Sequence, residues 1–273
     1  MSWSDTVGIN KLVTLLFLAF GLPLLAQNNY QIVQVQNGGT IVGTVKWAGP
    51  MPHLTAMPIT KDAQICDPEG RKNRDLERLI VNSQGGVANT VVYLKDVSSG
   101  KPFDLPQQRR FLDQKQCRYE PHILLVPQQT SLQMKSSDAT LHTVHMEGAA
   151  SYNLPFPFPN QTISRPMNTA GVAHMKCNGG HVWMNAEAIV AANPYYAVTD
   201  ADGKFELTDV PPGKYEIVAW HEGWEVQRSE ATYDVLTEHR VSRPVFSEPR
   251  AWTKSIAVEP GGKSTVTFVI SQK

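Results

Sequence analysis

A cysteine, a histidine and a methionine lie within eight residues of one another in the segment HMKCNGGHVWMNA, residues 174–186. They are Cys177, His181 and Met184, and their spacing is Cys-x3-His-x2-Met. A thiolate and a thioether are soft ligands that favour copper, and imidazole suits the same metal. Each residue alone has an ordinary structural explanation, because cysteine and methionine are typical core residues. The spacing therefore predicts a soft-metal site, with a buried cysteine among chance neighbours as the alternative.

A trigonal copper site with two histidines, a cysteine and a weak axial methionine needs a second histidine. The segment SSDATLHTVHMEG supplies two candidates, His142 and His145. Side chains alternate between the two faces of a strand, so residues three positions apart point to opposite sides. Only one of the two imidazoles is therefore expected to reach Cys177. A structural role is expected for three other histidines: His122, His174 and His221.

The N-terminal residues are typical of a targeting segment. Lys11 precedes the apolar run LVTLLFLAFGLPLLA, which ends at Ala26. The run is shorter than the roughly 20 residues that a membrane-spanning helix needs. A cleaved signal peptide over residues 1–26 is therefore favoured over a retained anchor. The expected location is periplasmic or extracellular, with membrane contact only if this segment is retained.

The three cysteines of an exported chain leave one thiol over if two of them pair. Cys66 and Cys117 lie far from the histidine-rich part of the sequence and have no neighbours typical of a metal site. We therefore predict that they form a disulfide. Cys177 is then the free thiol, which is a liability outside the cell when exposed but not when it binds a metal.

Composition and motifs exclude several classes of function. The formal net charge is zero, with 25 basic and 25 acidic residues, so nothing favours nucleic acid or an anionic membrane surface as a partner. Hydrophobic residues make up 41% of the chain, as expected for a packed core. The sequence has no Gly-x-Ser-x-Gly elbow, Walker loop, His-Glu-x-x-His or Cys-x-x-Cys-His motif. An enzyme is therefore not expected.

Strand patterns dominate the sequence, and proline and glycine separate them. Helical periodicity is nearly absent, with short helical turns expected only near residues 62–66 or 74–78. These features predict an all-β protein of the sandwich type. Residues 225–254 are charged and aromatic without a clear pattern, and are expected to form a long irregular excursion. The clearest strand segments are GTIVGTVKWAG (39–49), GGVANTVVYLKDV (85–97), PHILLVP (121–127), TSLQMKSSD (130–138) and STVTFVIS (264–271).

The segment TDADGKFELTDVPPGKYEIVAW, residues 199–220, resembles the carboxypeptidase regulatory-like (transthyretin-like) domain. Asp202-Gly203 is a strong hairpin-turn signal within it. The resemblance implies a small β-sandwich that is usually a structural or binding module. Residues 39–49 and 85–94 look like that family's first two strands, which would make the metal-like region an insertion.

Two further parts of the chain together resemble the cupredoxins. Those proteins carry an upstream histidine near a strand end, often as Asp-x-x-x-His-Asn-Val, and a later loop that holds cysteine, histidine and methionine. DATLHTV at residues 138–144 matches the upstream pattern, and CNGGHVWM at residues 177–184 matches the loop. The resemblance implies a Greek-key β-sandwich. It also selects His142 as the copper ligand and leaves His145 outside the site.

One position departs from the cupredoxin pattern. Thr143 stands where the family commonly has the asparagine that ties the two ligand loops together, and its hydroxyl is the group that could substitute. The loop spacing also resembles part of the binuclear copper centre of cytochrome oxidase. The first cysteine of such a centre would fall at Ala173, so a binuclear centre is not expected.

Most of the chain after residue 38 resembles a group of exported bacterial proteins that join these two domains. The resemblance is carried by CRYEPHILLVP (117–127) and CNGGHVWMNAEAIVAANPYYAVTDADGKFEL (177–207). The expected organisation is a signal peptide (1–26), an N-terminal strand and arm that contributes to the smaller sandwich (27–86), a cupredoxin-like copper domain (87–192) and a regulatory-like domain (193–273).

The implied function is that of a type 1 (blue) copper protein in electron transfer. Cys177, His142 and His181 would hold the copper, Met184 would be the weak axial ligand, and the edge of His181 would face an unidentified redox partner protein. A membrane-associated respiratory or photosynthetic complex is one such partner. The alternatives are a cell-surface structural or binding module with a non-redox metal site, and a periplasmic copper carrier.

Overall fold

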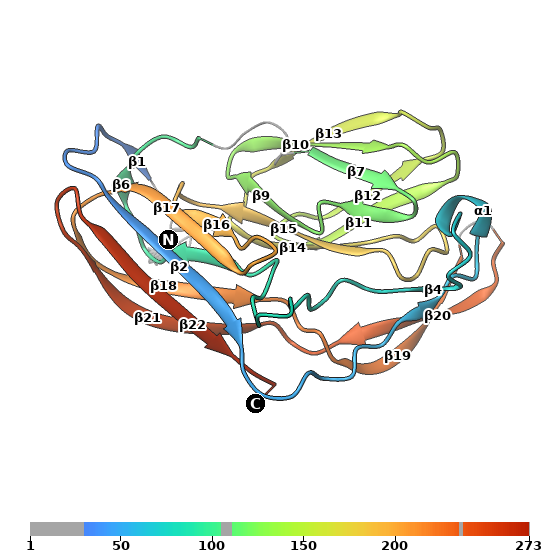
Figure 1. Ribbon diagram of the computed structural model, residues 1–273. Helices are drawn as coiled ribbons and strands as arrows, with labels where there is room; N and C mark the ends of the chain where they lie inside the picture. The colour runs from blue at the N-terminus through green and yellow to red at the C-terminus, as the bar shows by residue number, and fades with distance from the viewer. Residues whose placement is uncertain (1–29, 105–110, 235–236, 273) are drawn as a thin grey trace, which may run out of the picture.

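The computed structural model describes residues 30–104, 111–234 and 237–272 (Figure 1). Within these ranges nearly all regular structure is β-strand, as predicted, and the one helix is the single turn α1, Ala63–Cys66. None of the described helical structure has the length and apolar character needed to cross a bilayer. The predicted signal peptide, residues 1–26, lies outside the described residues.

The cupredoxin-like sandwich packs a four-stranded sheet, in the order β13-β10-β7-β8, on a five-stranded sheet, in the order β12-β11-β14-β15-β9. Strands β7 and β10 pair in parallel, as do β9 and β15, so the chain crosses between the sheets instead of forming successive hairpins. Its strands are β7 (Phe111–Lys115), β8 (Arg118–Glu120), β9 (Ile123–Pro127), β10 (Thr130–Ser136), β11 (His142–Gly148), β12 (Tyr152–Phe156), β13 (Thr162–Met167), β14 (Gly171–Lys176) and β15 (Asn185–Ala191).

The regulatory-like sandwich packs the sheet β16-β5-β18-β21 on the sheet β17-β2-β22. A turn forms at Asp202-Gly203, with Gly203 at φ +74°, but the hairpin predicted around it is wrong. The strands on either side of it do not pair with each other, because β16 joins β5 whereas β17 joins β2. The turn thus carries the chain from one sheet to the other. The strands are β2 (Gly39–Trp47), β5 (Val91–Leu94), β16 (Tyr196–Val198), β17 (Lys204–Val210), β18 (Gly213–His221), β21 (Arg250–Val258) and β22 (Lys263–Ile270).

Strand β5 corrects the expected domain boundary. From the sequence, residues 87–192 belong to the cupredoxin-like domain, yet β5 pairs with β16 and β18 of the other sandwich. The cupredoxin-like sandwich therefore begins at β7 and is inserted between β5 and β16. The apolar segment VVYL suits a buried position in either sandwich, so its composition does not reveal which sheet it joins.

The two sandwiches share a small core of their own. Val91 of β5 packs with Ile123, Leu125 and Ile189 of β9 and β15, away from the main core of either sandwich. The alternate residues of β9, such as Leu124, face the interior of the cupredoxin-like sandwich instead. The five-stranded sheet is therefore covered on both faces near this junction, which explains why residues 123–127 are buried without a break.

Two segments lie outside both sandwiches. The arm, residues 51–78, contains β3 (Met57–Pro58), α1 and β4 (Asn73–Arg74), and the predicted Cys66–Cys117 disulfide ties it to the turn between β7 and β8. The second segment is the hairpin of β19 (Val226–Tyr233) and β20 (Arg240–Phe246), so the irregular excursion expected at residues 225–254 is wrong. Its strands lack a continuous apolar face, since β19 is largely exposed. Apart from these, β1 (Gln31–Ile32) pairs with β6 (Ser99–Gly100).

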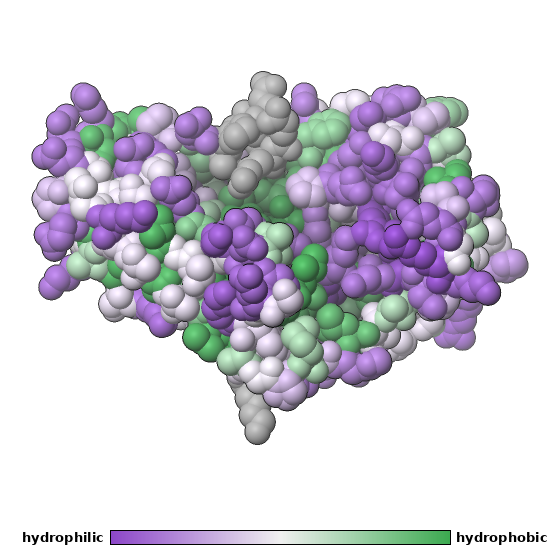
Figure 2. Space-filling view, viewed as in Figure 1, coloured by the Kyte–Doolittle hydropathy of each residue, from purple (hydrophilic) through white to green (hydrophobic). Residues whose placement is uncertain are grey.

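The arm and the β19–β20 hairpin lie at the same end of the molecule (Figure 1). Hydrophilic residues predominate over that end on the face shown in Figure 2.

Candidate metal centre

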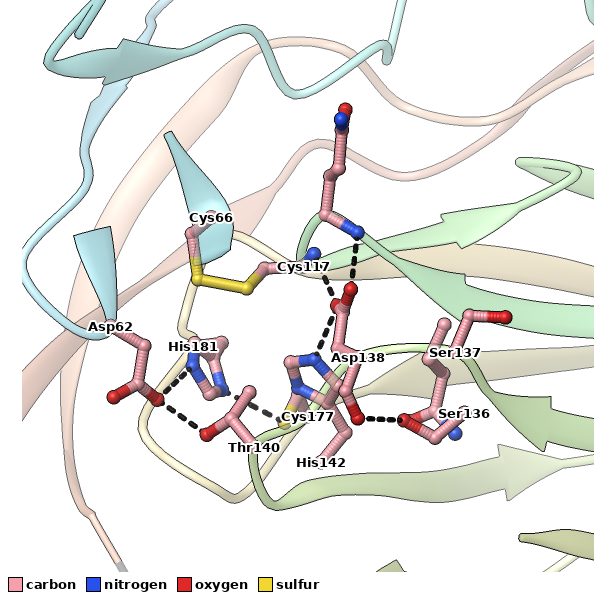
Figure 3. A network of polar contacts seen from close by, with 12 residues as sticks. Asp62, Cys66, Cys117, Ser136, Ser137, Asp138, Thr140, His142, Cys177 and His181 are labelled. Atoms are coloured by element: carbon pink, nitrogen blue, oxygen red, sulfur yellow. Dashed lines mark hydrogen bonds and ion pairs between the residues drawn. A yellow bond between two sulfur atoms is a disulfide. The ribbon is translucent and has the colours of Figure 1, made fainter. Parts of the chain in front are cut away.

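The structure brings three of the four predicted ligands together. One ligand atom each of His142, Cys177 and His181 lies within 4.8 Å of the others, and all three residues are fully buried. His142 begins β11, Cys177 follows the end of β14, and His181 lies on the loop between β14 and β15 (Figure 3). Because β11 and β14 are paired antiparallel neighbours, the start of one meets the end of the other.

His142 and His145 point to opposite sides of β11, as the two-residue strand period requires. The His142 side chain is inaccessible, whereas that of His145 is 24% exposed and its Nε2 lies 2.8 Å from Glu147 Oε1. His142 is therefore the histidine beside Cys177.

Asp138 fixes the orientation of the His142 ring. Its Oδ2 lies 2.8 Å from His142 Nε2, and its two carboxylate oxygens accept the backbone N–H groups of Gln116 and Cys117 at 2.8 Å each. The other ring nitrogen, His142 Nδ1, is buried without a hydrogen-bond partner. A buried, unpartnered imidazole nitrogen beside a thiol is what a metal ligand leaves in a metal-free structure, and a carboxylate behind the ring is its usual support.

His181 is oriented in the same way by a residue that the sequence did not indicate. Its Nδ1 lies 3.9 Å from Cys177 Sγ, and its Nε2 lies 3.0 Å from Asp62 Oδ2. The same Asp62 oxygen accepts a hydrogen bond of 2.6 Å from Thr140 Oγ1. Both histidines thus present Nδ1 towards the thiol and hold Nε2 against a carboxylate.

The expectation that the edge of His181 faces a partner is wrong. The His181 side chain has no exposed surface, because the arm crosses the ligand loop and places Asp62 against the outer nitrogen of the ring. Asp62 itself has a side chain that is 25% exposed. A protein that approaches this side of the centre therefore meets Asp62 instead of the imidazole.

Thr143 connects the two ligand segments, as its place in the sequence suggested. Its Oγ1 accepts the backbone N–H of Asn178 at 2.6 Å and lies 3.8 Å from Cys177 Sγ. The sulfur also accepts backbone N–H groups from Thr143 at 3.4 Å and Gly179 at 3.3 Å. These donors stabilise negative charge on the sulfur, so the surroundings favour a thiolate.

The charges within the group support the same conclusion. Burial raises the pKa of the Cys177 thiol, but interactions with His142 and His181 outweigh it and hold that pKa well below its usual range. Burial lowers the pKa of His142, but the interactions with Asp138 and Cys177 prevail and raise it to about 9. The two directions show that the surroundings favour negative charge on Cys177 and positive charge beside it, which is the environment that a bound metal cation would suit.

Met184 lies in the turn that follows His181. Its backbone N–H donates to the His181 carbonyl at 3.0 Å, and its side chain is buried in the same core cluster as Cys177. It also borders a pocket of about 410 Å³ that Arg243 and Phe246 of β20 help to line. Its role as a weak axial ligand stays a prediction.

Three other histidines, His122, His174 and His221, contact acidic residues away from this centre. His122 Nε2 contacts Glu222, and His174 Nδ1 lies 2.7 Å from Glu187. His221 Nδ1 lies 2.8 Å from the Glu222 carbonyl, to which it can donate. They belong to a charged cluster near the junction of the two sandwiches, where a structural role explains them.

One family model matches part of the chain, from the end of β15 through β16, β17 and β18 into the β19–β20 hairpin. The model of the second beta sandwich domain of the BOS complex subunit NOMO1-like family matches residues 190–244. This stretch overlaps the segment whose sequence resembles a regulatory-like sandwich. No curated protein matches the chain.

Several solved structures are similar to part of the chain. One is a copper-containing nitrite reductase from Thermus scotoductus SA-01, with 14% identity over 30% of this chain and 22% of that chain, at a TM-score of 0.29. An amicyanin mutant is 24% identical over 30% of this chain and 80% of its own, at a TM-score of 0.28. A purple cupredoxin from Nitrosopumilus maritimus is 19% identical over 27% of this chain and 81% of its own, at a TM-score of 0.24.

Proposed function

We propose that this protein binds one copper ion and transfers single electrons. The observation that carries the proposal is the buried group of His142, Cys177 and His181, in which both imidazoles present Nδ1 to a stabilised thiolate. This donor set suits copper, and Met184 would add the weak fourth ligand. Copper, when bound, supplies the Cu(I)/Cu(II) couple.

The protein's own contribution is to hold the ligands in place before the metal binds. Asp138 and Asp62 fix the two rings, and Thr143 fixes the loop that carries Cys177. Ligands held by the surrounding hydrogen bonds move little when the charge of the centre changes, which favours fast electron exchange. The N–H groups on the sulfur draw charge from it and would tune the reduction potential.

The proposed partner is a redox protein that docks over the end of the molecule where Asp62 is partly exposed. The hydrogen bond between Asp62 and His181 offers a short route from that surface to the ligands. We also infer an exported location, periplasmic or extracellular. The Cys66–Cys117 disulfide is consistent with that location, since such bonds persist in oxidising compartments.

A second candidate function is copper storage or delivery. The complete burial of His142, Cys177 and His181 favours it, because a metal enclosed in this way exchanges slowly with small ligands. In this case retention and release would matter more than the redox couple.

Copper loading of the protein tests the two candidates. We expect one copper per chain, an intense visible band from sulfur-to-copper charge transfer, and reversible bleaching by a mild reductant without loss of metal. Metal analysis and absorption spectroscopy supply both measurements. Copper bound without the intense band would contradict the electron-transfer proposal, and tight retention of Cu(I) against a chelator without reversible redox cycling would favour storage.

Replacing the upstream histidines one at a time tests the ligand assignment. His142→Ala removes a ligand and should weaken Cu(II) binding by more than the roughly 10–100-fold typical of losing an outer partner. It should also shift the spectrum towards an ordinary tetragonal site. His145→Ala removes the same side chain from the same strand, but from its other face, and should leave affinity and spectrum nearly unchanged. Competition titration and absorption spectra measure both, and the reverse pattern would refute the assignment.

A further inference from the structure

The ligand loop of the metal centre is covered by segments that belong to neither sandwich. From the arm, Lys61 Nζ donates to Gly179 O at 2.8 Å, and Asp62 contacts His181. From β20, Arg243 Nη2 donates to Cys177 O at 2.6 Å. The sandwich strands alone therefore do not account for the burial of the ligands.

The arm lies directly on the loop at Gly180. A Cβ atom at this glycine, which has φ +89°, would lie 2.5 Å from Asp234 Oδ2 and 3.0 Å from Lys61 Cδ. Lys61 and Asp234 are themselves an ion pair at 2.5 Å, with side chains 17% and 6% exposed. The arm and the end of β19 thus close over the loop together, and the absence of a side chain at position 180 permits the close approach.

The arm has little structure of its own to hold it there. Between residues 51 and 75, Cys66 is the one buried residue. Regular structure is limited to one helical turn and two strands of two residues each. A segment with so few buried contacts opens easily unless it is anchored. Its anchors at the centre are the Cys66–Cys117 disulfide and the contacts of Lys61 and Asp62.

We propose that the arm is a disulfide-anchored cover of the metal centre, which must move before a metal ion or a small thiol reagent can reach Cys177. Cys66 lies four residues after Asp62, so the covalent anchor restrains the residue that blocks His181. Loss of the anchor leaves the cover held by the polar contacts of Lys61 and Asp62 and by three side chains that are only partly buried, Met57, Ile59 and Ile65. Access to Cys177 should then become much more frequent while the sandwiches stay folded.

The reactivity of Cys177 in the metal-free protein tests this proposal without any assumption about copper. Cys177 is the one free cysteine and is buried, so an aromatic disulfide reagent that releases a coloured thiolate reports how often the cover opens. The wild type should react slowly. Cys66→Ala/Cys117→Ala adds no new thiol, and its reaction should be at least about ten times faster.

Two further variants keep the test decisive. Lys61→Met/Asp62→Ala retains the disulfide and removes the polar contacts, so it should also react faster, and it replaces the first variant if that one fails to fold. Lys204→Met loses an exposed ion pair with Asp202 far from the arm and should react like the wild type. Equal rates in wild type and both arm variants, or fast reaction of the wild type, would overturn the proposal.

The relevance of the cover to copper rests on the proposed function and needs a second measurement. In copper-loaded protein, Cys66→Ala/Cys117→Ala should keep the wild-type visible spectrum but lose Cu(I) to an excess of chelator at least about ten times faster. Failure of the chain to bind copper would refute the proposed function, whereas the thiol reactivity would still decide whether the arm is a cover.

Discussion

The Cys177→Ser variant is expected to lose the intense visible absorption of the copper-loaded protein completely. The band requires a thiolate bound to copper, and a serine hydroxyl is a harder ligand that stays protonated near neutral pH. His142 and His181 remain in place, each held by its own carboxylate, so weak copper binding should persist. Absorption spectroscopy together with metal analysis separates loss of the band from loss of the metal.

The matched control is Cys66→Ala/Cys117→Ala, which removes the other two cysteines and should keep the band. Serine is close in size to cysteine and can accept the N–H groups of Thr143 and Gly179, so the fold of Cys177→Ser should be preserved. An intense band in Cys177→Ser would show that Cys177 is not the metal-binding thiol, and its absence in the control would show that the band depends on the other two cysteines as well.

Much of the candidate centre was predictable because its residues lie on short, patterned segments. Cys177 and His181 are four positions apart on one loop, and the period of a strand separates His142 from His145. The disulfide followed from counting cysteines in a chain expected to be exported. These inferences need only the spacing of residues along a strand or loop, or the number of cysteines in the chain.

Asp62 was not predictable on that basis. It lies 119 positions before His181 in an arm without a hydrophobic pattern, and the contact exists only because the disulfide and the fold bring the arm over the loop. Asp138 was noticed as part of a pattern, but its hydrogen bonds to the backbone of Gln116 and Cys117 depend on how β7, β8 and β10 pair. Long-range pairing of this kind leaves no local signal.

The fold class was predictable, but the assignment of strands to sheets was not. β5 and β16 are separated in sequence by the whole cupredoxin-like sandwich, so only the tertiary structure shows that they are neighbours. The β19–β20 hairpin escaped notice because largely exposed strands do not show the alternation of apolar and polar residues that marks a strand packed on a core.

The Arg78→Met variant is expected to be the most destabilised of the single replacements considered, by about 3–5 kcal/mol in the free energy of unfolding. Arg78 Nη1 lies 2.7 Å from Glu222 and 3.5 Å from Glu187, whose side chains are only 1% and 3% exposed. Its Nε also donates to Gly223 O at 2.8 Å. Methionine keeps most of the volume but leaves the two buried carboxylates with only the imidazoles of His122 and His174 beside them. Urea unfolding of the metal-free protein measures the loss.

The pH dependence of that loss identifies its cause. Burial raises the pKa of Glu187 even with Arg78 present, whereas His122 and Arg78 outweigh burial at Glu222 and lower its pKa. Removal of the Arg78 cation should raise the pKa of both carboxyls. A carboxyl whose pKa is raised by folding stabilises the folded state below its unfolded pKa and loses that contribution as pH rises through the folded value. The deficit of Arg78→Met should therefore be larger at pH 8 than at pH 5.

The matched control is Arg71→Met. It breaks a pair with Glu69 in which the two side chains are 69% and 64% exposed, and it should cost at most about 1 kcal/mol in the free energy of unfolding at either pH. A similar loss in the two variants would show that burial of the carboxylates is not what makes Arg78 important.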